Sequence, residues 1–127
     1  MPKTAITTDG APAPAASYSQ AVRKGDILQV AGQVPIDPAT GRMAGPGVTD
    51  QVRQALRNIQ AILRAAGGDF DDVLMMRVYL TDVTHFGEMN EVYRTFVKEP
   101  FPARTTVYVG LPEGMLVEID ALAVLGD

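Results

Sequence analysis

The apolar residues between positions 49 and 66 recur at the spacing of one face of an amphipathic helix. The members of this face are Val52, Leu56, Ile59, Leu63 and Ala66. Thr49 is a candidate N-cap for the first turn, and Gly67 is a candidate left-handed residue after the last turn. The pattern predicts a helix over residues 49–66 with one face turned toward a core.

A second apolar stripe with helical spacing runs through residues 84–97. It consists of Phe86, Met89, Tyr93 and Phe96. Pro100 and Pro102 follow the stripe, and proline stops a helix because it lacks the backbone N–H that the helix needs. We therefore expect a second helix over residues 84–97, with His85 in a capping or surface role at its start.

The remaining apolar runs alternate with polar residues or are rich in β-branched residues, as is typical of strands. The clearest run lies at residues 73–81, and it would place Leu74, Met76, Val78 and Leu80 on one face. Further strands are predicted at residues 18–23, 27–30, 104–109 and 116–124. Short connections containing glycine suit a hairpin between the first pair and another between the last pair.

The predicted order ββαβαββ favours a two-layer α+β fold, with one domain over residues 1–127 and both helices on one face of a mixed sheet. Residues 1–17 are expected to be an extended leading segment, and residues 35–41 a turn-rich loop. The other sheet face would carry more apolar surface than two helices cover, so we expect self-association. The apolar residues expected on that face are Tyr79, Tyr108, Val117 and Ile119.

The composition of the 127 residues argues against several classes of function. A net charge of −4 and eleven scattered basic residues disfavour nucleic acid as a partner. The chain has no cysteine, which rules out disulfides, a thiolate nucleophile and zinc–cysteine sites. No signal peptide and no apolar run of membrane-spanning length is visible, so we expect a cytoplasmic protein without a membrane partner.

Two charged residues lie within strand-like runs near the end of the chain. Arg104 follows Phe101-Pro102-Ala103 and opens a β-branched run, and Glu118 lies between Val117 and Ile119. A buried charge needs a partner or a ligand, a guanidinium suits a carboxylate, and a glutamate can transfer protons. Two interpretations of Arg104 stay open: it binds a ligand carboxylate, or it anchors a loop or pairs across a subunit interface. If the last two strands form a hairpin, direct contact with Glu118 inside one subunit is not guaranteed.

Other chemistries have less support. One histidine and no cysteine disfavour a zinc site, and neither Ser17 nor Ser19 lies in a nucleophile elbow. The glycines form no phosphate-binding motif, so nucleotide binding has no support, and no metal site is expected. Asp120 shares a strand face with Glu118, and such an acidic pair on a solvated strand usually has no chemical role. Removal of Met1 would expose the amine of Pro2, which leaves tautomerase chemistry as a minor alternative.

Taken in order, several motifs resemble those of the RidA family, the YjgF-type reactive-intermediate deaminases. The matching segments are Tyr18-Ser19-Gln20-Ala21, Ala31-Gly32-Gln33-Val34-Pro35 continuing to Thr40-Gly41, Gln54 with Asn58-Ile59, Asn90 with Tyr93, Phe101-Pro102-Ala103-Arg104, and Glu118-Ile119-Asp120-Ala121. The resemblance covers nearly the whole chain. It implies a chorismate-mutase-like fold that assembles as a homotrimer, with active sites in clefts between subunits.

The resemblance also implies a reaction and a set of site residues. Proteins of this family hydrolyse enamine and imine acids, such as 2-aminoacrylate and 2-iminopropionate, to 2-keto acids and ammonia without a cofactor. Arg104 would bind the substrate carboxylate, and Glu118 would position or activate the attacking water. The further substrate-binding residues would be Tyr18, Ala31, Gly32 and Asn90. Ala31 stands where the family commonly has serine, which leaves the identity of the imine open.

Two other functions remain alternatives. A trimer of the same fold that binds small carboxylates or a protein partner without catalysis would use the same cleft. Ribonuclease activity has also been attached to this family, and the acidic balance and the single histidine disfavour it here.

Overall fold

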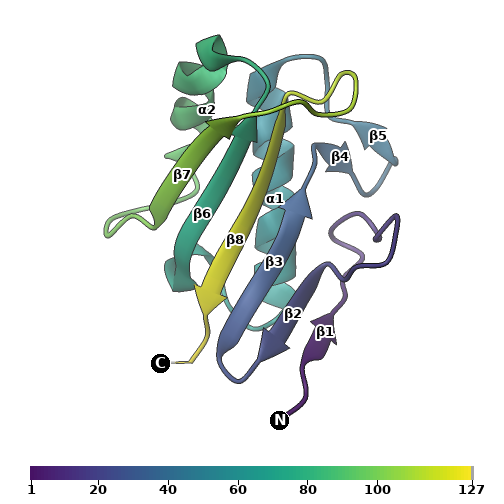
Figure 1. The fold of residues 1–127 in the computed structure, drawn as a ribbon, viewed down its shortest axis with the longest axis vertical. Coiled ribbons are helices and arrows are strands. Elements are labelled where there is room, and N and C mark those ends of the chain that lie inside the picture. The colour runs from purple at the N-terminus through teal and green to yellow at the C-terminus, as the bar shows by residue number, and fades with distance from the viewer. Residues whose placement is uncertain (127) are drawn as a thin grey trace.

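The protein is a mixed six-stranded sheet with two α-helices on one face, seen in a computed structural model that describes residues 1–126 (Figure 1). The strands lie in the order β1-β2-β3-β8-β6-β7, with β6 and β7 parallel and the other neighbours antiparallel. The main elements are β1 (Thr4–Ile6), β2 (Ala21–Lys24), β3 (Ile27–Gln33), α1 (Val48–Ala65), β6 (Val73–Leu80), α2 (Phe86–Tyr93), β7 (Ala103–Tyr108) and β8 (Val117–Val124). The predicted α+β class, with a mixed sheet and helices on one face, is confirmed.

The smaller elements refine the predicted connections. The turn-rich loop contains a two-stranded hairpin of β4 (Ile36–Asp37) and β5 (Arg42–Met43). Short 3₁₀ turns, η1 (Phe70–Asp72) and η2 (Val83–His85), precede β6 and α2. The leading segment is not entirely strand-free, because β1 pairs with β2 at the edge of the sheet. Three residues are too few to show an alternating pattern, so this strand could not be predicted from the sequence.

The predicted hairpin between the last two strands is wrong. Strand β8 lies between β3 and β6 at the centre of the sheet, while β7 lies outside β6 and runs parallel to it. The reason is the difference in burial between the two strands. Alternate residues of β8 are fully buried, at Val117, Ile119, Ala121 and Ala123, whereas β7 contains Arg104, Thr105 and Thr106 and suits an edge.

Helix α1 packs on β3 and β8 as its apolar face predicts, with Val52, Leu56, Ile59 and Leu63 fully buried. Gly67 has φ of +88° and ends the helix, as predicted, and its N–H donates to the carbonyl of Arg64 at 3.0 Å. The predicted Thr49 cap is wrong, because Gly47 is the cap residue. The Thr49 hydroxyl instead donates to Glu88 Oε2 at 2.7 Å and so links α1 to α2.

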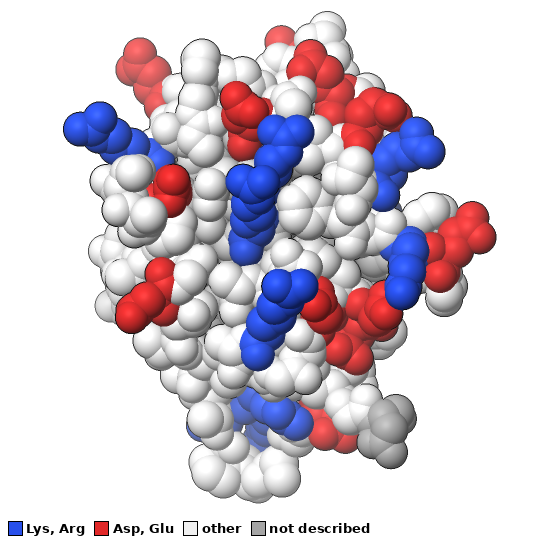
Figure 2. All heavy atoms as spheres, turned by 180° about the vertical axis from the view of Figure 1, so that it is seen from behind, with Lys and Arg blue, Asp and Glu red and all other residues white. Residues whose placement is uncertain are grey.

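Helix α2 is shorter than predicted and ends at Tyr93, before the proline-rich segment. Met89 and Tyr93 are buried, and Phe96 packs edge-on against Phe70 with ring centroids 5.8 Å apart. Phe86 is 39% exposed and lies outside the core. Figure 2 shows the helix-covered side of the molecule, where acidic and basic side chains are interspersed.

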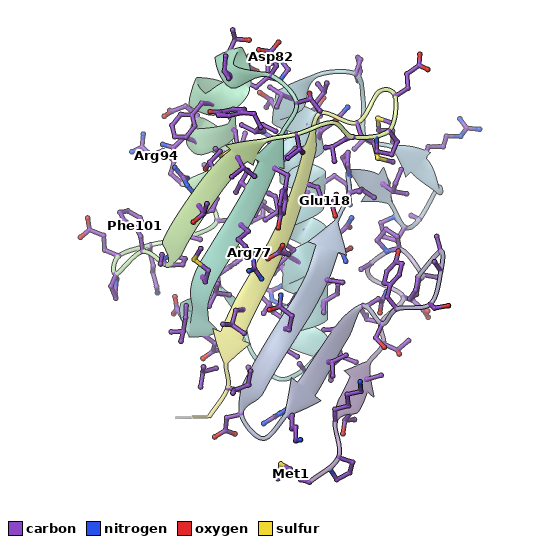
Figure 3. The ribbon with its side chains drawn as sticks, viewed as in Figure 1. Met1, Arg77, Asp82, Arg94, Phe101 and Glu118 are labelled. Carbon is purple, nitrogen blue, oxygen red and sulfur yellow. The ribbon has the colours of Figure 1, made fainter. Side chains whose placement is uncertain are left out.

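The open face of the sheet, toward the viewer in Figure 3, carries both charged and apolar side chains, including the labelled Arg77 and Glu118. Val117 and Ile119, expected there, are buried under the helices instead, since the odd-numbered residues of β8 face the core. Leu74 was expected on the same strand face as Met76 and Val78; those two are fully buried, but Leu74 is 57% exposed, because an irregularity between Val73 and Met75 shifts the register. The apolar residues exposed on the open face are Ile27, Val107 and Val124.

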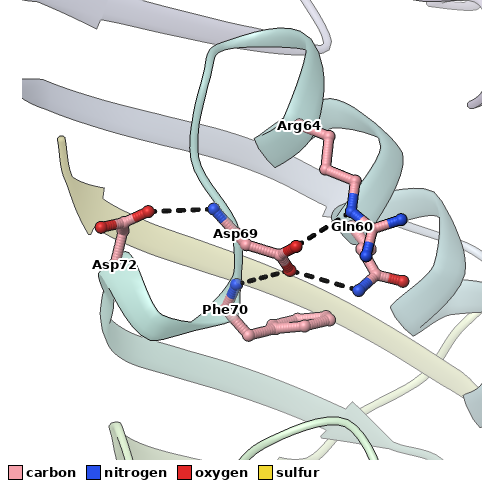
Figure 4. Close-up of polar contacts among 5 residues, drawn as sticks. All are labelled: Gln60, Arg64, Asp69, Phe70 and Asp72. Carbon is pink, nitrogen blue, oxygen red and sulfur yellow. Dashed lines mark hydrogen bonds and ion pairs between the residues drawn. The ribbon is translucent and has the colours of Figure 1, made fainter.

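Asp69 holds the turn between α1 and β6 through several hydrogen bonds (Figure 4). Its carboxylate accepts bonds from Arg64 Nε at 2.9 Å, from the Phe70 amide at 2.8 Å and from Gln60 Nε2 at 3.2 Å. In return, Asp72 accepts a bond from the Asp69 amide at 2.9 Å, which completes a capping box. Partial burial acts to raise the pKa of Asp69, but these bonds outweigh it and hold the pKa below its ordinary value.

Replacement of Asp69 by alanine is expected to lower the free energy of unfolding by about 1–2 kcal/mol at neutral pH, because the cap is lost. The folded-state pKa lies below the ordinary value of 3.8, so this stabilisation is present above that value and lost as the pH falls through the folded-state pKa. Urea unfolding of wild type and Asp69→Ala should therefore diverge near pH 7 and converge in acid. Asp71→Ala is the matched control, since Asp71 pairs with Lys98 at the exposed surface. A difference in the free energy of unfolding between wild type and Asp69→Ala that does not change with pH would contradict this role of the ionised Asp69 carboxylate.

Candidate active site

The register of the sheet places Arg104 and Glu118 on opposite faces. Arg104 lies beside Met76, which is fully buried under the helices. Glu118 lies beside Tyr79, three residues farther along β6 and therefore on the open face. The two side chains do not meet within one chain. The contact that the sequence left open would require a second copy of the chain.

On the helix side, Arg104 rests on three side chains of α2. Its Nη1 donates to Asn90 Oδ1 at 2.8 Å. Its Cζ lies 4.7 Å from the ring centroid of Tyr93 and 5.4 Å from that of Phe86. Phe86, Asn90 and Tyr93 share one face of α2, since they are spaced by four and three residues. We call these four residues the arginine site.

The charge of Arg104 has no neutralising partner in the part of the chain that the structure describes. Among residues 1–126, no acidic side chain lies within ion-pair distance of its guanidinium. The side chain is half-buried beside a cavity of about 440 Å³, whose lining includes Asn90, Tyr93, Phe101 and Pro102. A half-buried guanidinium with free N–H donors is suited to binding a carboxylate.

On the open face, Glu118 lies directly against the backbone of Gly32. A Cβ atom added at Gly32 would come within 3.0 Å of the Glu118 Cδ and closer still to Oε2, so a side chain at position 32 would displace the carboxylate. The close approach follows from a β-bulge, because Ala31 and Gly32 together oppose Asp120 in the ladder between β3 and β8. We call Ala31, Gly32, Glu118 and Asp120 the glutamate site.

The surroundings of Glu118 change its pKa. Burial, and then the negative charge of Asp120, raise the pKa of Glu118 above its ordinary value. Asp120 is held in place because it accepts bonds from Arg77 Nε at 2.8 Å and from the Tyr79 hydroxyl at 2.7 Å. The bond to Asp120 also raises the pKa of both Arg77 and Tyr79. Raised carboxyl pKa values in partly buried positions are typical of general acid–base groups.

The other residues expected from the sequence fall at different places. Tyr18 lies in the loop before β2 rather than in a strand; it is 52% exposed, and its hydroxyl accepts a bond from the Ala15 amide at 3.3 Å. The Ala31 amide donates to the Gln20 carbonyl at 2.9 Å. His85 is the cap residue of α2, but its side chain makes no capping bond. The structure thus joins Arg104 with Asn90, and Glu118 with Gly32, whose neighbour Ala31 lies in the same bulge; within residues 1–126 the Tyr18 side chain forms no hydrogen bond to either set.

Sequence reasoning missed the neighbours that hold the two charged residues. The sequence pattern assigns Phe86 and Tyr93 to the core stripe of a helix, gives Arg77 no role, and expects Tyr79 only as apolar surface on the open face. The spacing of Phe86, Asn90 and Tyr93 contained a usable signal, because it places an amide between two rings on one helix face. The bonds from Arg77 and Tyr79 to Asp120 had no such signal, since they depend on which strand lies beside β8.

Residues 1–126 lack two further features, a metal-binding cluster and a membrane-spanning helix. No group of three or more histidine and acidic side chains in this part of the chain is arranged to hold a metal ion. Neither α1 nor any other helix in the same range combines the length and apolar character needed to cross a membrane.

The chain is similar to proteins from all three domains of life. A family model described as endoribonuclease L-PSP matches residues 8–125. A RutC family protein of Pyrococcus horikoshii is 48% identical, over 95% of this chain and 97% of that protein. The 2-iminobutanoate/2-iminopropanoate deaminase of Mus musculus is 43% identical, over 95% of this chain and 90% of the mouse protein.

A solved structure agrees in fold as well as in sequence. RidA from an Antarctic Psychrobacter is 41% identical and superimposes with a TM-score of 0.92, over 96% of this chain and 99% of that one. The match spans both the arginine site and the glutamate site, since each lies within residues 8–125. The resemblance noted in the sequence is therefore confirmed, and the chain belongs to the RidA family, whose matching model is described as endoribonuclease L-PSP.

Proposed function

We propose that the protein hydrolyses reactive enamine and imine acids of the 2-aminoacrylate and 2-iminopropionate type to 2-keto acids and ammonia. The observation that carries the proposal is a half-buried Arg104 without an acidic partner among residues 1–126, in a protein that also holds a raised-pKa glutamate. The names of the mammalian relatives, 2-iminobutanoate/2-iminopropanoate deaminases, support the same reaction.

In this proposal each charged residue has one task. Arg104 binds the substrate carboxylate through two parallel hydrogen bonds, which fixes the imine carbon near the glutamate. Ionised Glu118 takes a proton from water as the water oxygen bonds to that carbon, and the C=N electron pair moves to nitrogen. Glu118 then returns that proton to the nitrogen, which gives a carbinolamine with Glu118 ionised again. The hydroxyl proton of the carbinolamine next passes through Glu118 to the amino nitrogen, the C–N bond breaks as the keto group forms, and ammonia leaves.

The site is proposed to form between subunits of a homotrimer. Arg104 and Glu118 lie on opposite faces of the sheet, so one chain cannot bring both to the same substrate. A cyclic assembly, in which the arginine site of one chain faces the glutamate site of the next, would complete a site at every interface. Exposed Ile27, Val107 and Val124 on the open face support burial of that face against another copy. Ala31, Gly32 and Tyr18 would then contact the substrate from the glutamate side.

RNA cleavage, which the description of the matching family names, fits this chain less well. The net charge is −4, and the helix-covered side carries interspersed charges instead of a basic stripe (Figure 2). With a single histidine, the chain also lacks a histidine pair for acid–base cleavage of a phosphodiester.

The first test follows the loss of 2-iminopropionate generated by an amino-acid oxidase. Wild type should accelerate hydrolysis, and Arg104→Lys should lower kcat/KM by roughly 10- to 100-fold, because lysine cannot form the two parallel bonds. Arg94→Lys is the matched control, as Arg94 lines the same cavity but is exposed and paired with Glu91. Full activity in Arg104→Lys would show that Arg104 does not bind the substrate through two parallel bonds. Binding of 2-ketobutyrate by a wild type that hydrolyses no imine would instead support the non-catalytic binding protein.

The second test concerns the protonation of Glu118. Glu118→Gln should lower kcat by roughly 10²- to 10⁴-fold, since the proton acceptor is lost. The base must be ionised and its pKa is raised, so wild-type activity should decline with falling pH at a point above the ordinary value of 4.5. Asp120→Asn removes the neighbouring negative charge and should move that decline to lower pH. Glu113→Gln, at an exposed position, should leave the profile unchanged. An unshifted profile in Asp120→Asn would show that Asp120 does not act on Glu118.

The third test asks whether one site draws on two chains. Arg104→Ala and Glu118→Gln should each be inactive, yet trimers refolded from an equal mixture should regain roughly a quarter of the sites. The recovered sites are those in which an intact arginine meets an intact glutamate. A mixture of Arg104→Ala and Asn90→Ala is the control, because both changes affect the arginine site and no site regains both residues. Failure of the first mixture to recover activity would contradict a site shared between two chains.

A further inference from the structure

Arg104 is held in position by neutral groups. Its guanidinium lies over the rings of Phe86 and Tyr93, with Cζ at 5.4 Å and 4.7 Å from their centroids. Asn90 fixes one nitrogen through its side-chain oxygen at 2.8 Å. Rings attract a cation through their electron-rich faces, and this attraction strengthens when water is excluded. An amide oxygen adds direction to the contact without adding a charge.

Tyr93 behaves as a neutral ring rather than as an anion. It is 5% exposed, and its hydroxyl has no hydrogen-bond partner within residues 1–126. Burial raises the pKa of Tyr93, and this outweighs the opposite effect of Arg104. The phenol therefore stays protonated at neutral pH and leaves the charge of Arg104 intact.

No carboxylate among residues 1–126 lies within ion-pair distance of Arg104, and this has a consequence for binding. An aspartate or glutamate could also orient the arginine, but it would neutralise the guanidinium and compete with the carboxylate of a ligand. Rings and an amide avoid that competition. The positions of Phe86, Asn90 and Tyr93 on one face of α2 provide all three contacts from a single rigid element.

We propose that Phe86 and Tyr93 are positioning residues that hold Arg104 by its face without neutralising it, so that the affinity of the arginine site for carboxylates depends on both rings. The inference rests on the proposed carboxylate-binding role of Arg104. It adds that the residues that contact Arg104 must be neutral: an anionic side chain that bound Arg104 more strongly would weaken ligand binding.

Calorimetric titration with 2-ketobutyrate tests the role of the rings. Phe86→Leu and Tyr93→Leu should each raise Kd by roughly 3- to 10-fold, whereas Tyr93→Phe keeps the ring and should bind within about 2-fold of wild type. Tyr108→Leu is the matched control, because Tyr108 is an exposed ring on the same strand as Arg104 that neither lines the cavity nor lies under the guanidinium. Partial unfolding would lower the stoichiometry and leave Kd unchanged, so a change in Kd reports on the arginine. Wild-type Kd values in both leucine variants would overturn the inference.

Asn90→Asp tests the requirement for neutrality. The aspartate is nearly the same shape and would bond to Arg104 more strongly, so a purely geometric role predicts equal or tighter binding of 2-ketobutyrate. Our inference predicts the opposite, a rise in Kd of roughly 10-fold or more, because Arg104 becomes paired. Unchanged binding by Asn90→Asp would overturn the neutrality requirement. If wild type itself binds no 2-ketobutyrate, the carboxylate-binding role of Arg104 is wrong, and so is this inference. If wild type binds and the ring and Asn90 variants have the same Kd as wild type, this inference is wrong and the proposed function is unaffected.

Discussion

The two-residue period of strand β8 decides where the chemical groups of the sheet lie. The buried set of this strand is Val117, Ile119, Ala121 and Ala123. The residues between them, including Glu118 and Asp120, belong to the open face. A slip of one residue would exchange the two sets, burying carboxylates and exposing the core, so the hydrophobic effect fixes the register. That register in turn sets Glu118 against Gly32 and brings Asp120 within reach of Arg77 and Tyr79.

The sequence revealed the segments of this fold better than their partners. The apolar face of α1 was recognisable because four of its members are fully buried and lie at regular helical steps. Strand order was not recognisable, since period-two patterning shows that a segment is a strand but not which neighbour it will have. The short connection before β8 suggested a hairpin, yet the more apolar strand took the centre and β7, with Arg104, took the edge. Burial over the whole sheet outweighed local turn geometry.

The charged residues of the site were also predictable, while their supporting neighbours were not. Arg104 and Glu118 stood out because charges are rare in strand-like runs, and Asn90 and Gly32 followed from the family resemblance. Aromatic residues at helical spacing are as typical of a hydrophobic core as of a site where rings contact a cation, so the spacing of Phe86 and Tyr93 predicted only that they belong to the core. Asp120 was expected to be a solvated carboxylate; its side chain is 13% exposed and bonded to two neighbours. Such contacts arise between strands and leave no trace in local spacing.

The central place of β8 has a consequence for how the chain is made. Within residues 1–126 it is the last strand to leave the ribosome, yet it is the strand that joins β3 on one side to β6 on the other. Until residues 117–124 emerge, the β1-β2-β3 half and the β6-β7 half each present an unpaired inner edge, with apolar side chains along it. A nascent chain therefore cannot complete its sheet before residues 117–124 are made. Until then, rapid synthesis or protection of the two unpaired edges is needed to keep the chain from pairing with another unfinished copy.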